Sequence, residues 1–240
     1  MIQVIITQSC PDCGSANIVK NGKDYQGNQK FRCNDCGRCG TLDAPGRYMP
    51  ERKEEILRAY QERSSMRGIR RTFGVARTTL ARWLKQKAQA LPDLAETLDP
   101  ARADDVLELD ELWSFVFSKD NQRWVWIALC RRTRQIVAFF VGDRSETSCR
   151  KLWERLPEAY RRCRTFSDFW DAYQKVFVTG NHHSVGKESG ETNHVERWNN
   201  TLRQRLARFV RKTLSFSKSD FYHELVLRLF ILRYNIECIS

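Results

Sequence analysis

Apolar residues recur at intervals of three or four in the last third of the chain, which is the spacing of one face of an α-helix. This face comprises Val195, Trp198, Leu202, Leu206 and Phe209. The pattern predicts a helix over Thr192–Lys212. A second strip of that helix would carry Glu196, Asn199, Asn200 and Arg203, and a third would carry Arg205, Arg208 and Lys212.

The charge on this predicted helix is nearly all of one sign. Six Lys/Arg and no Asp/Glu lie between Arg197 and Lys212, and one carboxylate, Glu196, stands just before them. A solvated surface helix usually mixes both signs. The pattern favours a helix that lies along DNA and offers one carboxylate to a metal, with the DNA contacts made by Asn199, Arg203, Arg205, Arg208 and Lys212. A packed amphipathic helix with a basic outer face is the alternative.

Three stretches before this helix are rich in aliphatic and aromatic residues and alternate in part, which is typical of β-strands. They span Val106–Phe117, Arg123–Cys130 and Gln135–Val141 and predict an antiparallel meander. Farther along we expect a helix, a short strand, a weak strand and a closing amphipathic helix, at Thr147–Tyr160, Arg164–Ser167, Val178–Val185 and Lys218–Tyr234. This order of elements is that of an α/β ribonuclease-H-like catalytic domain.

Three carboxylates stand at positions that such a domain would bring together. Asp110 lies within the first strand, where Asp is normally rare, Asp168 follows the fourth strand, and Glu196 lies on the late helix. Carboxylate oxygens suit Mg²⁺, and two Mg²⁺ roughly 4 Å apart can activate a hydroxyl group and stabilise the leaving oxygen in phosphoryl transfer. We therefore predict a catalytic triad that binds two Mg²⁺, which Mn²⁺ can replace. Glu108 and Glu111 compete with Asp110 for the first place.

The stretch between residues 47 and 91 predicts three short helices. Pro50 opens the first, Met66–Phe73 forms the second, and Ala76–Gln89 forms the third after the turn Gly74-Val75. A short helix, a turn with glycine and a longer helix are the order of a helix-turn-helix, whose last helix enters the major groove of DNA. The expected DNA contacts are Arg77, Thr78, Thr79 and Arg82. A plain three-helix bundle with a basic surface is the alternative.

The N-terminal residues contain two Cys-x-x-Cys-Gly units, at Cys10–Gly14 and Cys33–Gly37. Four thiolates at this spacing suit one tetrahedral Zn²⁺. Because so small a module buries little apolar surface, the metal would supply much of its folding free energy, on the order of 10 kcal/mol. We predict a zinc ribbon with one structural Zn²⁺ bound by Cys10, Cys13, Cys33 and Cys36. Cys39 follows Cys36 by three residues, so a Cys36/Cys39 pair is the alternative.

Charge is distributed unevenly along the 240 residues, whose formal net charge is +12. Residues 1–91 carry 17 Lys/Arg against 8 Asp/Glu, residues 92–111 carry 1 against 8, and residues 192–218 carry 7 against 1. Two basic blocks around an acidic one suit two nucleic-acid contacts around a metal centre. The nine cysteines, an odd number, and the lack of a signal peptide favour reduced thiols in the cytoplasm, and no apolar run is long enough to span a membrane.

These patterns predict a multidomain chain: a zinc ribbon at 1–46, an all-α helix-turn-helix domain at 47–91, an acidic linker at 92–105 and the α/β catalytic domain at 106–240. Several motifs resemble those of the transposases of the insertion-sequence-one family, which are of the Asp-Asp-Glu type. They are the paired cysteine motifs, Leu109–Trp113, Ser167–Tyr173, and His194–Arg205 followed by Arg211–Ser217. The resemblance covers nearly the whole chain.

The resemblance implies that the N-terminal domains bind the terminal inverted repeats of a mobile element. It also implies a catalytic domain that nicks DNA ends and joins the freed 3′-hydroxyl groups to target DNA, with Asp110, Asp168 and Glu196 as the metal-binding triad and Arg203 nearby. Members of the family often arise by ribosomal frameshifting, and this chain is similar to the fused full-length product. Synapsis of two double-stranded DNA ends implies at least a homodimer.

Two other functions fit parts of the sequence. A DNA-binding regulator would need only the ribbon and the helix-turn-helix, and a structure-specific nuclease would use the catalytic domain without joining ends. The triad between two basic blocks favours the transposase over the regulator, and the helix-turn-helix favours it over the nuclease. Lone tryptophans such as Trp124, Trp126 and Trp198 are expected in the core rather than as platforms for bases.

Overall fold

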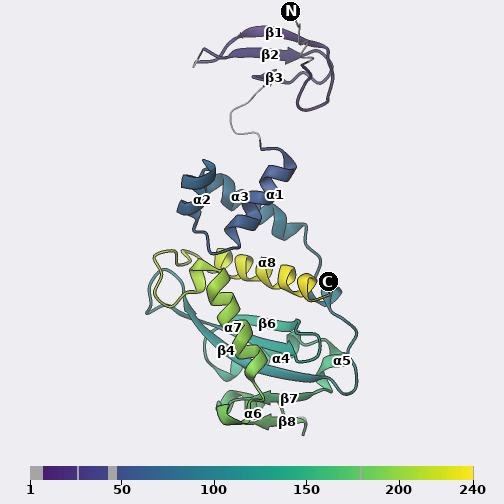
Figure 1. Cartoon of the computed structure of the whole chain (residues 1–240), viewed down its shortest axis with the longest axis vertical. Helices are drawn as coiled ribbons and strands as arrows, with labels where there is room; N and C mark the ends of the chain where they lie inside the picture. The colour runs from purple at the N-terminus through teal and green to yellow at the C-terminus, as the bar shows by residue number, and fades with distance from the viewer. Residues whose placement is uncertain (1–7, 26, 43–47, 179, 240) are drawn as a thin grey trace, which may run out of the picture. The chain divides into compact units, whose positions relative to one another are not determined.

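The computed structural model describes residues 8–25, 27–42, 48–178 and 180–239. Contacts within the chain divide it into two compact units, which meet in sequence between Lys53 and Glu54. The boundary expected between the zinc ribbon and the helix-turn-helix domain, between residues 46 and 47, lies outside the described ranges. In the first unit, the strands β1 (Ile18–Lys23), β2 (Gln29–Cys33) and β3 (Cys39–Gly40) form an antiparallel sheet (Figure 1).

The two cysteine turns of the first unit share one backbone conformation. Gly14 and Gly37 adopt positive φ angles of 75° and 73°, a region that glycine enters without steric cost. Their N–H groups donate hydrogen bonds to the carbonyls of Cys10 and Cys33, at 2.8 and 3.0 Å. Each turn therefore folds back tightly enough to present two sulfurs to one point.

The predicted three helices form α1 (Pro50–Tyr60), α2 (Met66–Phe73) and α3 (Arg77–Gln89). The hydroxyl oxygen of Ser65 accepts a hydrogen bond from the N–H of Gly68 and caps α2, whereas Gly74, with φ of 72°, ends it. Their shared core is fully buried and consists of Ile56, Leu57, Ile69, Leu80 and Leu84. The periodicity of the sequence therefore located these helices correctly.

A five-stranded mixed sheet forms the rest of the second unit, in the order β6-β5-β4-β7-β8. The strands are β4 (Val106–Phe115), β5 (Gln122–Cys130), β6 (Ile136–Gly142), β7 (Arg164–Ser167) and β8 (His182–Ser184). The first three form the expected antiparallel meander, and β7 runs parallel to β4. This parallel pairing reaches only from Val106 to Glu108, so the two strands part before Asp110 and Asp168.

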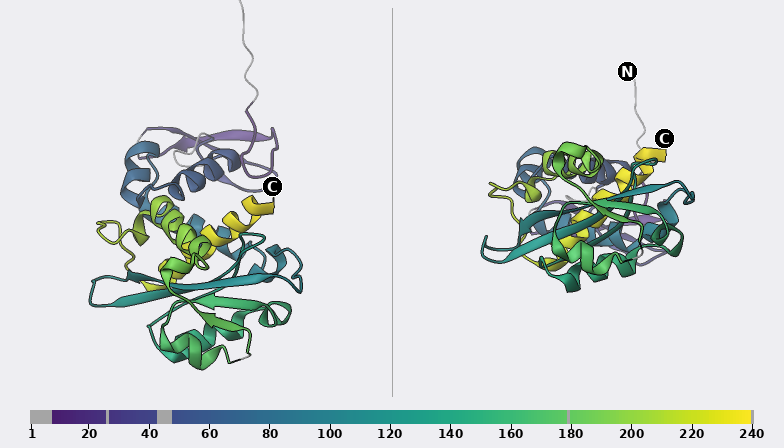
Figure 2. Two further views of the ribbon diagram at one scale, coloured as in Figure 1. Left: turned by 60° about the horizontal axis from the view of Figure 1, so that its bottom comes forward. Right: turned by 90° about the horizontal axis from the view of Figure 1, so that it is seen from below.

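Helices cover both faces of this sheet (Figures 1 and 2). On one face lie α4 (Glu146–Arg155), α5 (Glu158–Arg161) and α6 (Asp171–Val176), and on the other lie α7 (Asn193–Arg205) and α8 (Asp220–Ile239). Single 3₁₀ turns occur at Leu94–Thr97, Lys187–Ser189 and Ala207–Phe209. Because side chains alternate along a strand, Leu107 and Leu109 of β4 join the core under α4, whereas Glu108 and Asp110 face α7.

Three expected elements have different bounds in the structure. The helix expected over Thr147–Tyr160 is interrupted at Pro157, whose ring cannot continue it, and forms α4 and α5. The closing helix extends to Ile239, and the weak strand shrinks to β8. Among the described helices, none combines the length and apolar character that crossing a bilayer requires.

The most consequential correction concerns the helix predicted over Thr192–Lys212. It ends at Arg205, because Leu206 adopts an extended conformation and a 3₁₀ turn follows. Leu206 and Phe209 are nevertheless 2% and 1% exposed, so the apolar period continues after the helix has stopped. The strip of Arg205, Arg208 and Lys212 therefore does not exist as one helical face.

Candidate functional site

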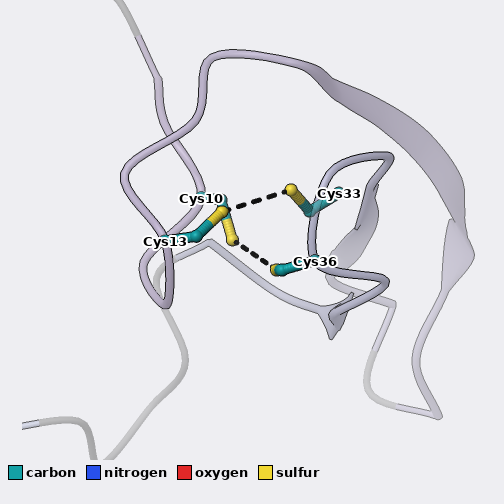
Figure 3. Close-up of side chains that lie close together, drawn as sticks. All are labelled: Cys10, Cys13, Cys33 and Cys36. Carbon is teal, nitrogen blue, oxygen red and sulfur yellow. Dashed lines mark hydrogen bonds between the residues drawn. The ribbon is translucent and has the colours of Figure 1, made fainter.

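Four cysteines of the first unit converge. The sulfurs of Cys10, Cys13, Cys33 and Cys36 all lie within 4.8 Å of one another, and their side chains point toward one another in Figure 3. The Sγ–Sγ distance is 3.6 Å both between Cys10 and Cys36 and between Cys13 and Cys33. Tetrahedral Zn²⁺ with bonds of about 2.3 Å needs sulfurs about 3.8 Å apart. The cluster fits a structural zinc.

The surroundings of the cluster also fit metal binding. Main-chain hydrogen bonds from Asp12 and then Cys13 lower the pKa of the Cys10 thiol to about 6, and the thiolate is the form that binds zinc. Against a main-chain hydrogen bond from Ser15, contacts with the thiols of Cys36 and Cys33 raise the pKa of Cys13 to about 12, because four sulfurs this close cannot all be charged without a cation between them. Cys39 lies on β3 instead, where its sulfur accepts a hydrogen bond from the amide of Asn21 at 2.9 Å. The pair Cys33 and Cys36 is therefore confirmed over the alternative pair with Cys39.

Strand β4 carries three carboxylates, Glu108, Asp110 and Glu111, and each has different partners. Asp110 faces α7, where the amide nitrogen of Asn199 donates a hydrogen bond to its Oδ2 at 2.6 Å. Its pKa is raised to about 7 by burial and by the negative charges of Glu111 and the two other predicted ligands. Asp168 and Glu196 therefore lie near enough for their charges to act on Asp110.

Glu111 points to the opposite face of the sheet. Its Oε1 accepts a hydrogen bond from Nε of Arg144 at 2.9 Å, and its Oε2 accepts one from the hydroxyl of Tyr173 at 2.8 Å. Burial raises the pKa of Glu111, with Asp168 as the next cause. A carboxylate held in this way is part of the core beside the site.

Glu108 is fully buried and holds the start of α7. It accepts hydrogen bonds from the N–H groups of His194 and Val195, at 2.8 and 3.0 Å, and from Nε of Arg131 at 2.8 Å. These N–H groups belong to the first turn of α7, which has no partner for them within the helix. Sequence reasoning missed this role, although Glu108 stands two residues before Asp110 and so on the same face of β4.

The two other predicted ligands come from elements that meet β4 at this end. Asp168 directly follows β7, and its Oδ1 accepts a hydrogen bond from the N–H of Trp170 at 3.0 Å. Glu196 lies in the first turn of α7. Within the ranges that the structure describes, the four cysteines are the one group of three or more ligands within 4.8 Å, so the three carboxylates do not all lie within that distance of one another.

A cavity of about 330 Å³ opens beside Glu196. Its cations are Lys187, Arg203 and Arg211, and its remaining lining residues are Glu111, Leu112, Trp113, Trp124, Asn199 and Asn200. The guanidinium group of Arg203 is held in place, because it donates hydrogen bonds to the carbonyls of Phe209 and Trp113 at 2.9 and 3.2 Å. The cavity thus combines carboxylates and fixed positive charge, as a site for phosphate and metal requires.

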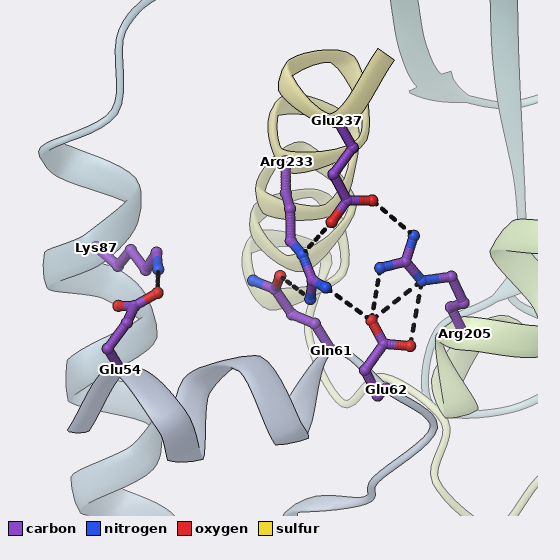
Figure 4. A network of polar contacts seen from close by, with 7 residues as sticks. All are labelled: Glu54, Gln61, Glu62, Lys87, Arg205, Arg233 and Glu237. Carbon is purple, nitrogen blue, oxygen red and sulfur yellow. Dashed lines mark hydrogen bonds and ion pairs between the residues drawn. The ribbon is translucent and has the colours of Figure 1, made fainter. Parts of the chain in front are cut away.

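Two of the expected DNA contacts have other partners. Arg205 forms ion pairs with Glu62 of the segment after α1 and with Glu237 of α8, within the network drawn in Figure 4. Arg208 is 8% exposed and donates hydrogen bonds to the hydroxyl groups of Tyr60 and Ser217. Both arginines therefore link the segment of α1 to α8 and to the region after α7, and their role in binding DNA stays a prediction.

The other expected DNA contacts remain accessible in part. Arg77, Thr78 and Arg82 are exposed on α3, and Thr79 is half-buried. Lys212 is exposed in the segment after α7, and Asn199 lines the cavity although it bonds to Asp110. None of these residues is placed against DNA by the structure, so their role stays a prediction.

Two family models match the chain. The one described as IS1 transposase matches residues 105–236, and the one described as InsA N-terminal domain matches residues 1–37. Insertion element iso-IS1n protein InsB from Shigella dysenteriae is 40% identical over 126 residues, which cover 52% of this chain and 93% of that protein. Insertion element IS1 protein InsB from Shigella flexneri is 38% identical over 120 residues, covering 50% and 88%. An Escherichia coli relative, Insertion element IS1 4 protein InsB, is 36% identical over 120 residues, covering 50% and 70%.

Proposed function

Because the chain belongs to the IS1 transposase family, we propose that it binds the inverted repeats at the ends of a mobile DNA element, cuts the DNA there and joins the freed strands to target DNA. The observation that carries this proposal is the arrangement of three elements: β4 carries Asp110 and faces α7, the first turn of α7 carries Glu196, and Asp168 directly follows β7, the neighbour of β4. Burial and the charges of neighbouring carboxylates, Asp168 and Glu196 among them, raise the pKa of Asp110 to about 7. Divalent cations would neutralise this concentration of carboxylates.

In this proposal the second unit contains a ribonuclease-H-like catalytic domain. Asp110, Asp168 and Glu196 offer only oxygen ligands, which is the donor set that Mg²⁺ prefers. When bound, two Mg²⁺ ions would activate the attacking hydroxyl group and stabilise the leaving oxygen. A pair of ions roughly 4 Å apart does not require all three carboxylates to touch one ion, so this arrangement does not need all three within 4.8 Å of one another.

The remaining residues of the site would position the substrate. Asn199 donates a hydrogen bond to the Oδ2 atom of Asp110 and the N–H of Glu111 donates one to Oδ1, so each oxygen would keep a lone pair for a metal. Arg203, fixed by two main-chain carbonyls, would bind a phosphate of the strand being cut. The exposed start of α3 would read the ends of the element in the major groove. Bringing two ends together would require at least a dimer.

The test is a strand-transfer assay. Purified protein is incubated with labelled duplexes of the inverted repeat that flanks the coding sequence, with Mg²⁺ or without it. We expect nicked and joined products only with Mg²⁺, and their loss in each of the variants Asp110→Asn, Asp168→Asn and Glu196→Gln. Asp120→Asn is the matched control, because Asp120 is exposed on the turn between β4 and β5.

The same assay separates the transposase from the two other functions. If the triad variants kept every activity while wild-type protein still bound the ends, the chain would act as a DNA-binding regulator. If wild-type protein cut branched DNA and never joined ends, it would be a nuclease. Nicking and joining that persist after Glu196→Gln would refute the assignment of the site.

A further inference from the structure

Two tryptophans line the cavity beside Glu196. Trp113 of β4 and Trp124 of β5 stand directly opposite each other in the antiparallel register, so their side chains project from the same face of the sheet. Both are half-buried. By contrast, Trp126 and Trp198 are 0% and 1% exposed and belong to the core, as predicted. Trp124 also packs against the core, as expected, but it is half-buried and lines the cavity as well.

Neighbouring side chains hold this aromatic wall in place. The ring of Trp113 lies 5.5 Å from that of Phe115, measured between centroids. The guanidinium carbon of Arg144 lies 4.5 Å from the ring centroid of Trp124 and 4.0 Å from that of Trp170, while the same guanidinium group pairs with Glu111. Because its neighbours already fix it, the wall would lose little conformational freedom on binding a ligand.

The cavity also holds three cations that lack an ion-pair partner among the described residues. Lys187 and Arg211 are exposed, and within the described ranges neither forms an ion pair, nor does Arg203. Burial lowers the pKa of Arg203 and the nearby charge of Arg211 lowers it further, whereas the charge of Asp110 raises it. An anion bound between the two arginines would reduce their mutual repulsion.

Resting on the proposed function, we propose that this cavity binds one unpaired nucleotide of the strand being cut. Its base would stack against Trp113 and Trp124, and its phosphate would lie near Arg203 and Arg211. A volume of about 330 Å³ is at the lower end of small-ligand pockets, about 300–1,000 Å³, and so admits a single nucleotide rather than a base pair with two backbones.

Stacking provides the energy for opening the base pair. Removing an aromatic ring that stacks on a base weakens single-strand binding by about 5- to 150-fold. The cost of unpairing one base is of the same order. A base at the end of a duplex stacks on fewer neighbouring bases. Such a base would therefore enter the cavity with little net cost in free energy.

The test couples a protein change to a DNA change. Binding of the end duplex is measured in Ca²⁺ in place of Mg²⁺, so that affinity is read without strand cleavage. The base is removed at each of the last few positions in turn, and wild-type protein is compared with Trp113→Leu. At the position bound in the cavity we expect base removal to weaken wild-type binding about tenfold and to have no further effect on Trp113→Leu.

Two variants serve as matched controls. Trp113→Phe keeps a stacking ring and should keep the sensitivity to base removal. Trp153→Leu removes a half-buried tryptophan of α4 that packs against Phe177, with ring centroids 4.9 Å apart, and should also keep it. If base removal had the same effect on wild-type protein and on Trp113→Leu at every position, the proposal would be overturned, although nicking and joining by wild-type protein would leave the proposed function standing.

Two further measurements test the proposal without depending on the folding of Trp113→Leu, and they distinguish an unpaired base in the cavity from a paired one. Arg211→Gln changes an exposed residue, and it should remove the sensitivity to a neutral methylphosphonate linkage at the same nucleotide. Removing the complementary base instead should strengthen wild-type binding, because no pair then has to open. Weaker binding in this last case, or coupling at the phosphate alone, would mean that the cavity does not hold an unpaired base.

Discussion

Glu108 and His194 are joined twice: the Oε2 atom of the buried glutamate accepts a hydrogen bond from the main-chain N–H of His194 at 2.8 Å, and its Oε1 atom lies 2.6 Å from Nδ1 of the same residue. This pair fixes the first turn of α7 against β4. That turn carries Glu196, and β4 carries Asp110. The distance between two of the proposed metal ligands therefore depends on a residue that is not itself a ligand.

We predict that Glu108→Gln lowers both the unfolding free energy of the protein and its rate of strand cleavage. The neutral amide cannot replace the charged acceptor for Arg131 and the helix N–H groups, which should cost about 2 kcal/mol of unfolding free energy. Strand cleavage should fall by about 10- to 100-fold, and more Mg²⁺ should be needed for half-maximal rate. Cleavage rates across a Mg²⁺ titration and urea unfolding check both effects.

The control for this variant is Glu191→Gln. Glu191 pairs with the same Arg131, but its side chain is 37% exposed, and its carboxylate accepts no hydrogen bond from the first turn of α7 among the described residues. It should leave the Mg²⁺ dependence unchanged. A Glu108→Gln protein with the wild-type rate and Mg²⁺ dependence would contradict the positioning role.

Zinc removal should unfold the first unit and leave the second folded, because the cluster and its sheet lie within residues 8–42. After chelation we expect amide hydrogens of β1 and β2 to exchange freely while those of β4 and β5 stay protected. Hydrogen exchange read by mass spectrometry measures this. Cys33→Ser should lose the metal and Cys39→Ser should retain one Zn²⁺ per chain. Loss of zinc in Cys39→Ser would contradict the ligand set.

Stability should fall in acid partly through His223. This residue is fully buried, and burial, followed by the charge of Arg208, lowers its pKa to about 3 from an ordinary value of 6.5. The folded protein keeps the imidazole neutral, whereas the unfolded chain takes up a proton below about pH 6.5. The contribution is thus complete above pH 6.5 and is lost as the pH falls towards 3, by about 2 kcal/mol at pH 5.

His223→Gln isolates that contribution. The imidazole nitrogens lie 3.0 Å from the hydroxyl of Ser114 and 2.8 Å from that of Ser217, and glutamine can keep one of these contacts. The variant should be less stable at pH 7 and should lose about 2 kcal/mol less than wild type between pH 7 and pH 5. Urea unfolding at both pH values measures the difference. Parallel losses in the two proteins would rule out His223 as a source of the acid sensitivity.

Because Arg205 and Arg208 are bound by protein partners, we predict that Arg205 contributes to stability and not to DNA affinity. Arg205→Ala breaks the ion pairs with Glu62 and Glu237, which are about half exposed, so it should cost about 1 kcal/mol. It should leave the salt dependence of DNA binding unchanged, whereas Arg82→Ala and Lys212→Ala should each lower the slope of log K against log salt by about 1. Titrations at several salt concentrations measure the slope. An equal reduction in Arg205→Ala would restore that residue to the DNA interface.

Sequence alone determined the features that depend on short-range spacing. Two Cys-x-x-Cys-Gly turns specify four ligands because each turn is closed by its own glycine, and the bounds of α2 follow from Ser65 and Gly74 at its ends. The meander of β4, β5 and β6 was also predictable, because alternation and short turns are local signals. The positions of Asp110, Asp168 and Glu196 along these elements follow from the same order.

The tertiary structure alone decided which charged residue meets which. Glu108, Asp110 and Glu111 look alike in sequence, but one binds the start of α7, one faces Asn199, and one lies under Arg144. The helix α7 stops at Arg205 although its apolar period continues, because burial of Leu206 and Phe209 can be satisfied without helical backbone. Periodicity reports which side chains are buried, whereas partners far apart in the chain are set by packing and by the need of each buried charge for a counter-charge or a hydrogen bond.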